Sequence, residues 1–233
     1  MNNLSLLFKT LRKDISALFI VCLMTIFLID FWLKGYVEWF SGGAKLGDII
    51  YKLCLSYTSA FIFYFLVVHI KAQKDKTNIN NYVIPKVERI ISCCNELIAA
   101  LAKSANVNLA NKYPTDEELS IICLNINPHT AAPMMKSDFS GHINWVGFFD
   151  FYKRRSNETT DKIFVTMPHL DTELVNIIAR IDDCSYFVLL DLIGPFTGRI
   201  TDLTSFQAVL TDYFKLTKEL EKYATEKLKH YKK

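Results

Sequence analysis

Histidines are the first side chains to consider for chemistry, because imidazole carries protons near neutral pH and binds metals. No histidine of this chain stands three or four residues from another, the spacing that would place two on one face of a helix. The HExxH, Walker A and GxSxG motifs are also absent from the sequence. We therefore predict no catalytic residue, no metal and no cofactor, and expect that the protein is not an enzyme. The five histidines are His69, His129, His142, His169 and His230.

Acidic residues gather at one place in the second half of the chain. Asp182 and Asp183 are adjacent, and Asp171 and Glu173 lie upstream. Such carboxylates could bind a metal, but around helix ends they more often cap the helix or carry solvated charge. We favour the second interpretation.

The cysteines give no sign of a structural metal or a disulfide framework. No two of the six have the spacing of a zinc knuckle, and a bridge between the adjacent Cys93 and Cys94 would be strained. The pattern is typical of reduced thiols in a cytosolic domain.

Basic residues form two clusters that could bind anions. One is Lys153, Arg154 and Arg155, and the other is the tail with Lys227, Lys229, Lys232 and Lys233. Either cluster could contact nucleic acid phosphates or anionic lipid headgroups. Ordinary solubilising charge is the alternative, and the formal net charge of +3 does not by itself indicate a polyanion partner.

Two long apolar runs organise the rest of the chain. Residues 15–33 and 49–70 are each long enough to cross a bilayer as a helix, which takes about 20 residues. We predict a transmembrane hairpin over residues 1–71, with the lipid bilayer as a partner, and a cytoplasmic helical domain over residues 72–233. The first run is too long for the core of a signal peptide, and a second run follows it directly.

The lysines and arginines that flank the two runs predict the orientation of the hairpin. Positive charge gathers before the first run and after the second, with less between them, so both termini are expected in the cytoplasm. The predicted location is a bacterial inner membrane, crossed twice. The flanking residues are Lys9, Arg12, Lys13, Lys71, Lys74 and Lys76, against Lys34 and Lys45 in the turn.

Polar and small residues inside the runs are the candidates for membrane packing or for a pore. Asp30 and Lys52 lie at similar depth from the outer side, so they could pair with each other or reach the interface separately. Ser56 and Ala60 have the spacing that lets two helices approach closely, and Ser59 lies beside them. These residues serve either packing within one hairpin or a homo-oligomeric interface.

The remainder of the chain predicts an all-α fold that ends in a long C-terminal helix. Residues 71–81 are expected to be a polar connection, with Pro85 in the first turn of the helix that follows, and residues 157–161 are expected to interrupt another helix. No β-hairpin is predicted. The expected helices cover about residues 82–101, 116–125, 143–155, 171–181, 186–193 and 202–232.

Three short motifs resemble those of a group of bacterial proteins with two transmembrane helices. They are SYTSAFIFY at residues 56–64, KAQKDK at 71–76 and PHLDTEL at 168–174. The group includes the membrane effectors of some retron anti-phage systems. The resemblance implies a toxin-like effector that a reverse transcriptase and its DNA–RNA product hold silent, and that damages the membrane and stops cell growth on infection.

The sequence therefore supports three hypotheses of decreasing weight. The first is a non-enzymatic membrane effector whose hairpins associate after release from a partner. The second is a membrane-anchored scaffold or adaptor whose helical domain binds a protein or a nucleic acid. The third is an enzyme whose site is assembled from distant residues.

Overall fold

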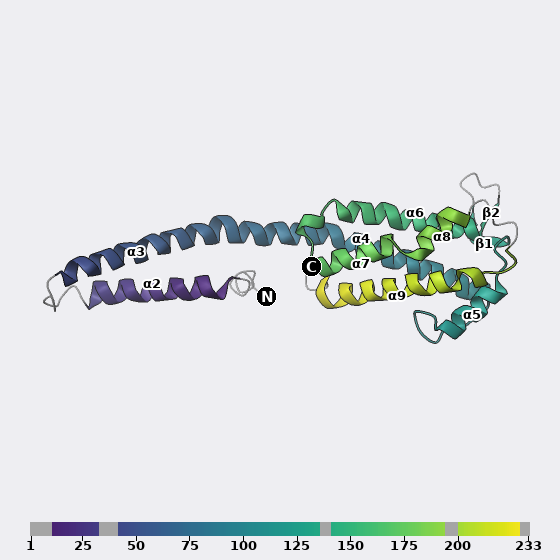
Figure 1. Ribbon diagram of the computed structural model, residues 1–233, viewed down its shortest axis with the longest axis horizontal. Helices are drawn as coiled ribbons and strands as arrows, with labels where there is room; N and C mark the ends of the chain where they lie inside the picture. The colour runs from purple at the N-terminus through teal and green to yellow at the C-terminus, as the bar shows by residue number, and fades with distance from the viewer. Residues whose placement is uncertain (1–10, 33–41, 136–140, 194–199, 229–233) are drawn as a thin grey trace. The chain divides into compact units, whose positions relative to one another are not determined.

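The computed structural model describes residues 11–32, 42–135, 141–193 and 200–228. The chain divides into two compact units, unit 1 (Met1–Thr77) and unit 2 (Asn78–Lys233). The structure is 80% helical and 4% strand, which confirms the prediction of a mostly helical chain (Figure 1). Lys34 of the predicted turn and Lys229, Lys232 and Lys233 of the tail lie outside the described ranges.

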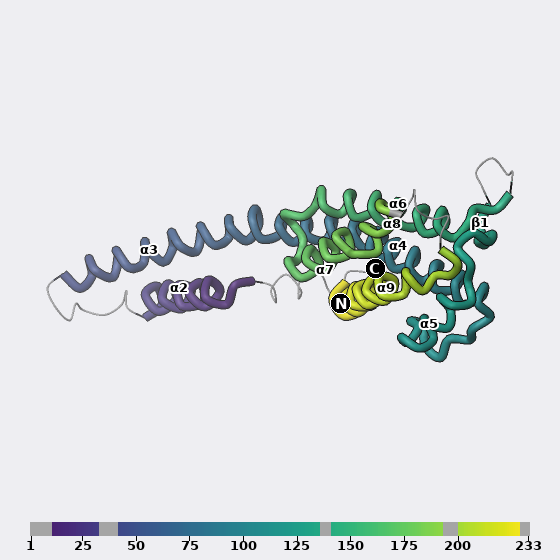
Figure 2. Tube along the Cα trace, turned by 45° about the vertical axis from the view of Figure 1, so that its right-hand side comes forward, coloured from purple at the N-terminus to yellow at the C-terminus, as the bar shows by residue number. Residues whose placement is uncertain are grey.

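In the described part of unit 1, α2 (Lys13–Phe31) and α3 (Gly43–Phe63) run side by side (Figures 1 and 2). The π-helix η2 (Tyr64–His69) follows α3 directly, and α4 (Ile70–Ser104) follows η2. Gly42 takes a positive φ of 95° just before α3, a conformation that glycine adopts without strain. The helix therefore begins well before residue 49, where the second apolar run was predicted to start.

The helix predicted to begin at residue 82 begins at Ile70, so the prediction of its start is wrong and the polar stretch at residues 71–81 is helical throughout. Lysine, alanine, glutamine and aspartate there reduce apolar contacts but do not oppose helix formation strongly. Pro85 also lies in the interior of α4 and not in a first turn. Proline leaves the carbonyl four residues earlier without its usual donor. That residue, Asn81, is exposed, so water can serve its carbonyl.

Unit 2 is built mainly from helices that lie alongside α4. Figures 1 and 2 both show α6, α7 and α9 next to α4. The elements after α4 are α5 (Asp116–Asn125), β1 (Ala131–Met135), β2 (His142–Asn144), α6 (Trp145–Phe164), η3 (Met167–His169), α7 (Thr172–Asp182), α8 (Ser185–Ile193), η5 (Thr204–Phe206), α9 (Gln207–Tyr223) and the π-helix η6 (Ala224–Leu228).

Several predictions for unit 2 are confirmed by local contacts. The helix expected over residues 116–125 is α5, and Thr115 and Glu118 form a capping box at its start. Asp171 caps α7 by accepting a hydrogen bond from the Glu173 amide at 2.9 Å. The apolar run expected to be a helix over residues 186–193 is α8.

Three other predictions for unit 2 are corrected. β1 and β2 pair as an antiparallel hairpin that the sequence did not predict. The α6 helix continues through residues 157–161, and within it the Thr159 hydroxyl donates to the Arg155 carbonyl of the preceding turn. The C-terminal helix begins at Gln207 and changes to π-helical form at Ala224.

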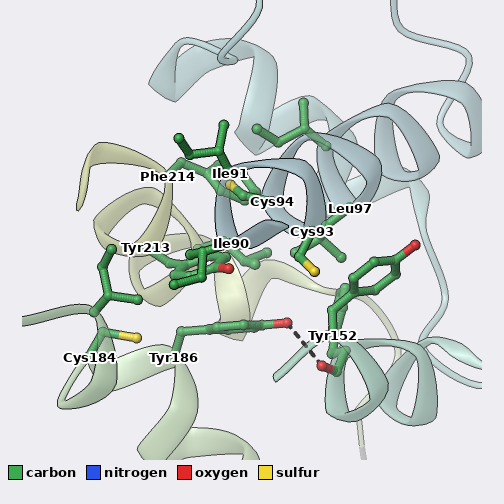
Figure 3. Packing of buried hydrophobic residues seen from close by; sticks show 14 of the residues in the cluster. Ile90, Ile91, Cys93, Cys94, Leu97, Tyr152, Cys184, Tyr186, Tyr213 and Phe214 are labelled. Carbon is green, nitrogen blue, oxygen red and sulfur yellow. Dashed lines mark hydrogen bonds between the residues drawn. The ribbon is translucent and has the colours of Figure 1, made fainter. Parts of the chain in front are cut away.

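The core of unit 2 surrounds the buried face of α4. Tyr186 of α8 and Tyr213 of α9 stack with ring centroids 5.0 Å apart (Figure 3). The Tyr186 hydroxyl donates to the Phe149 carbonyl at 3.4 Å, which gives this buried phenol a partner. Unit 2 thus encloses an aromatic core of its own.

Candidate functional site

The inner face of α3 packs against α2 through four positions spaced as one side of a helix. The Tyr57 hydroxyl donates to the Ile15 carbonyl at 3.1 Å, and the rings of Phe19 and Phe61 stack at 4.0 Å. The positions are Tyr51, Cys54, Tyr57 and Phe61. Their spacing fixes which side of α3 is turned toward α2.

Within one chain, the contacts described for Asp30 and Lys52 are with other residues, whereas the pairing of Asp30 with Lys52 of a neighbouring chain stays a prediction. The Asp30 carboxylate accepts a hydrogen bond from the Tyr51 hydroxyl at 3.2 Å. The Lys52 ammonium forms its ion pair with Asp48, one turn earlier on α3, at 2.6 Å. Asp48 was not among the predicted site residues, because the second span was expected to begin after it.

The outward face of α3 carries a polar stripe. Ser56 follows Cys54 by two residues, and at about 100° per residue this places Ser56 on the side away from α2. The stripe is Lys45, Asp48, Lys52, Ser56 and Ser59, all of them exposed. Ala60, also exposed, borders it. Ser56, Ser59 and Ala60 therefore do not serve packing against α2, which was one of the two predicted roles.

Many exposed side chains of α2, α3 and η2 are large and apolar. Two helices are long and apolar enough to cross a membrane, and only 6% of the apolar window of each is buried within the structure. The core helix of a soluble domain would be mostly buried. The exposed side chains that flank the polar stripe include Leu46, Ile49, Leu53, Leu55 and Ile62.

The three residues of the first basic cluster differ in how far unit 2 buries them. Lys153 is buried and pairs with Asp191 of α8, so it cannot offer its charge to a phosphate, and this prediction is corrected. Arg154 is exposed and pairs with Asp150 at 2.7 Å, whereas Arg155 is half-buried. The helix α6 thus presents neighbouring basic residues in different surroundings.

The second basic cluster lies mostly outside the described residues. Lys227 is exposed and pairs with Glu173 of α7. That contact raises the pKa of Lys227. Lys229, Lys232 and Lys233 fall beyond residue 228, so their predicted role stays a prediction.

The acidic and cysteine residues considered for chemistry in unit 2 include Asp182, Cys123 and Cys184, and the contacts described for these three are structural. Asp182 accepts a hydrogen bond from Thr160 at 3.0 Å. No group of three or more His, Cys, Asp or Glu side chains suited to a metal occurs in the described part of the chain. Burial raises the pKa of Cys123 to about 12 and that of Cys184 to about 11, as expected for unreactive thiols.

A groove of about 890 Å³ lies between the segment before α5 and the surface of α9. Its lining residues include the lysines Lys215 and Lys218 and the acidic residues Asp116 and Glu117, so charges of both signs line it. Lys112 and Tyr113 both bond Glu221 at its edge. The mixed charge gives no preference for an anionic or a cationic ligand.

Comparison of the chain with protein-family models, with curated proteins and with solved structures gives no match. The likeness to two-span retron effectors therefore rests on the three short motifs alone. The outward face of α3 is the candidate functional site, because it exposes charged and hydroxyl side chains among apolar ones on a helix long and apolar enough to cross a membrane.

Proposed function

We propose that the protein is a non-enzymatic effector of a bacterial inner membrane. In this proposal α2 and α3 cross the bilayer as a hairpin, both termini lie in the cytoplasm, and copies of the hairpin associate to open an aqueous path. Unit 2 carries the restraint that keeps the hairpins apart until a trigger releases them.

One observation carries the proposal: the polar stripe of α3 points away from α2. Charged and hydroxyl groups that face hydrocarbon are costly; a charge costs a few kcal/mol near the middle of a span and less toward its end, where Lys45, Asp48 and Lys52 lie. The Asp48–Lys52 pair reduces that cost but does not remove it. Several copies that turn their stripes toward one another would place these side chains against each other or against water.

The identity of the restraint rests on the resemblance to retron effectors. A reverse transcriptase with its DNA–RNA product is the partner that this resemblance proposes for unit 2. Arg154 is an exposed residue that could approach a phosphate, because its contact with Asp150 is a surface ion pair worth little free energy. Growth arrest on phage infection would be the biological result.

Inducible expression with a membrane-potential dye tests the proposed function. We expect depolarisation on release or infection with the natural chain, and none when Ser56 and Ser59 are both replaced by leucine. A matched control exchanges apolar residues off the stripe, Leu53→Ile with Ile62→Leu, and should depolarise normally. A membrane that stays polarised with the natural chain under every condition, infection included, would contradict the proposal.

A membrane-anchored adaptor is the second candidate, and the separate core of unit 2 is what favours it. Replacement of unit 1 by an unrelated two-span anchor distinguishes the two. An adaptor keeps its activity after the exchange, whereas the proposed effector loses it.

A further inference from the structure

The outward face of α3 changes character before it reaches the inner end of the span. Its outer part carries the polar stripe, which ends at Ser59. The next position on the same face is Phe63, four residues later, with 65% of its surface exposed. Leu66 and Val67 are the next exposed apolar side chains, in η2. A hydroxyl-bearing surface is thus followed by a bulky apolar one.

The depth of Phe63 follows from the rise of an α-helix. The helix rises about 16 Å from Lys52 to Phe63 and roughly 12 Å more to Lys71, against a hydrocarbon core of about 30 Å. Phe63 therefore lies in the inner half of the proposed membrane span, beyond the reach of the charged residues at either end.

The helix geometry changes at the same place. Phe63 is the last residue of α3, and the next six residues are π-helical. The Ile70 amide, just after η2, donates to the Phe65 carbonyl five residues earlier, which is the hydrogen bond of a π turn. π-helical turns are rare and occur often at functional sites. The change from polar to apolar surface and the change of helix type coincide.

We propose that Phe63, followed by Leu66 and Val67, forms the hydrophobic constriction of the path that the polar stripe lines. This proposal rests on the proposed function. In the closed path, the Phe63 rings of the associated copies, one from each, would form the narrowest point. A narrow apolar ring excludes water and ions without a physical plug. Ser56 and Ser59 would be hydrated from the outer side while the path stays closed.

The π-helix supplies an element that could move the ring. A return of η2 to α-helical hydrogen bonding would rotate the segment before it relative to the segment after it, since a π turn holds more residues than an α turn. Phe63 stands at that junction, so its ring would leave the constriction.

The test compares Phe63→Ser with Ile62→Ser, in cells and in vesicles of phosphatidylethanolamine and phosphatidylglycerol that contain the purified full-length protein. Ile62 is the adjacent residue, is 48% exposed and lies off the stripe. We expect at least a tenfold increase in the leakage of a small fluorescent dye for Phe63→Ser without any trigger, and none for Ile62→Ser. Phe63→Leu, which keeps the constriction apolar, should remain closed.

The outcomes separate this inference from the proposed function. Equal leakage from Phe63→Ser and Ile62→Ser, with a natural chain that opens on release, would overturn the constriction and leave the effector intact. If the natural chain never opens under any condition and vesicles with Phe63→Ser do not leak, both the constriction and the proposed effector function would be overturned. If Phe63→Ser does not reach the membrane fraction, Phe63→Ala replaces it, and we expect leakage above that of Ile62→Ala.

Discussion

The hydroxyl of Tyr57 on α3 donates a hydrogen bond to the backbone carbonyl of Ile15 on α2, across a distance of 3.1 Å. This bond fixes the rotation of α3 about its own axis. Ser56 and Ser59, one residue before and two residues after Tyr57, therefore face outward. The exposed polar surface of unit 1 thus depends on a contact made on the opposite side of the helix.

The two cysteines of unit 1 should form a disulfide within one chain when the protein is oxidised in the membrane. Cys22 on α2 and Cys54 on α3 are free thiols that lie against each other. Copper–phenanthroline treatment followed by peptide mass spectrometry should find them joined within a monomer. Cys54→Ser is the control, and a product linked only between chains would contradict the packing of α2 on α3.

Reversal of the charge at Lys52 should change the ion preference of the open path. Asp48 and Lys52 form a neutral pair, and Lys52→Glu makes this part of the stripe acidic. In planar bilayers with a KCl gradient, the reversal potential should move toward that of potassium. The double exchange Asp48→Lys with Lys52→Asp keeps the pair and should behave as the natural chain. An unchanged potential would place Lys52 outside the path.

Removal of the Asp191 charge should destabilise unit 2 more than removal of both charges of the pair. Asp191→Asn leaves the buried Lys153 ammonium without this carboxylate, and we expect a loss of about 1–2 kcal/mol, moderated by the exposure of Asp191. Lys153→Met with Asp191→Asn should restore most of it. Urea unfolding of the full chain in detergent, followed by tryptophan fluorescence, measures the difference. An equal loss in both variants would show that the pair does not contribute in this way.

The thiols of unit 2 should resist alkylation while the protein is folded. With pKa values of about 12 for Cys123 and about 11 for Cys184, the thiolate is scarce at pH 8, and burial also blocks access. Iodoacetamide labelling should be slower than for an exposed thiol by roughly a hundredfold or more. Mass spectrometry before and after denaturation checks this, and rapid labelling of Cys123 in the folded chain would contradict its position in the core.

Acid should remove the contribution of Glu221 to stability. Burial acts to raise the pKa of Glu221, but bonds from Lys112 and Tyr113 outweigh burial and hold that pKa below its usual value. A carboxylate with a lowered folded-state pKa stabilises the fold above its unfolded-state pKa, and this stability disappears as pH falls through the folded-state value. Glu221→Gln should therefore be less stable than the natural chain at pH 7, by about 1 kcal/mol or less, but not near pH 3. The same gap at both pH values in thermal unfolding would refute this assignment.

Local signals in the sequence predicted much of the helical fold. The capping box of Thr115 and Glu118 and the Asp171 cap involve neighbours in the chain, so their bonds can be read from spacing. The apolar periodicity of α4 is likewise local. The β-hairpin was missed because β1 contains Pro133 and β2 is only three residues long, so neither shows a strand pattern.

The candidate site could be predicted only in part, because contacts between helices decide which of its residues are exposed. Spacing placed Ser56 near Ser59 and Ala60, but the face that α2 covers is decided by Tyr57 and Phe61. Lys153 looked like its neighbour Arg154 in the sequence. Only the approach of Asp191 from α8 distinguishes the buried lysine from the exposed arginine.

The segment of α4 from Lys71 to Tyr82 has mostly exposed side chains, including the lysines at 71, 74 and 76. A helix with so little tertiary contact opens locally at small cost in free energy, and trypsin cuts after lysine in such openings. We expect brief digestion to cleave here first and to yield a detergent-dependent fragment and a water-soluble one. Val83 and Val87, both fully buried, come soon after the cleavage sites and would remain with the soluble fragment.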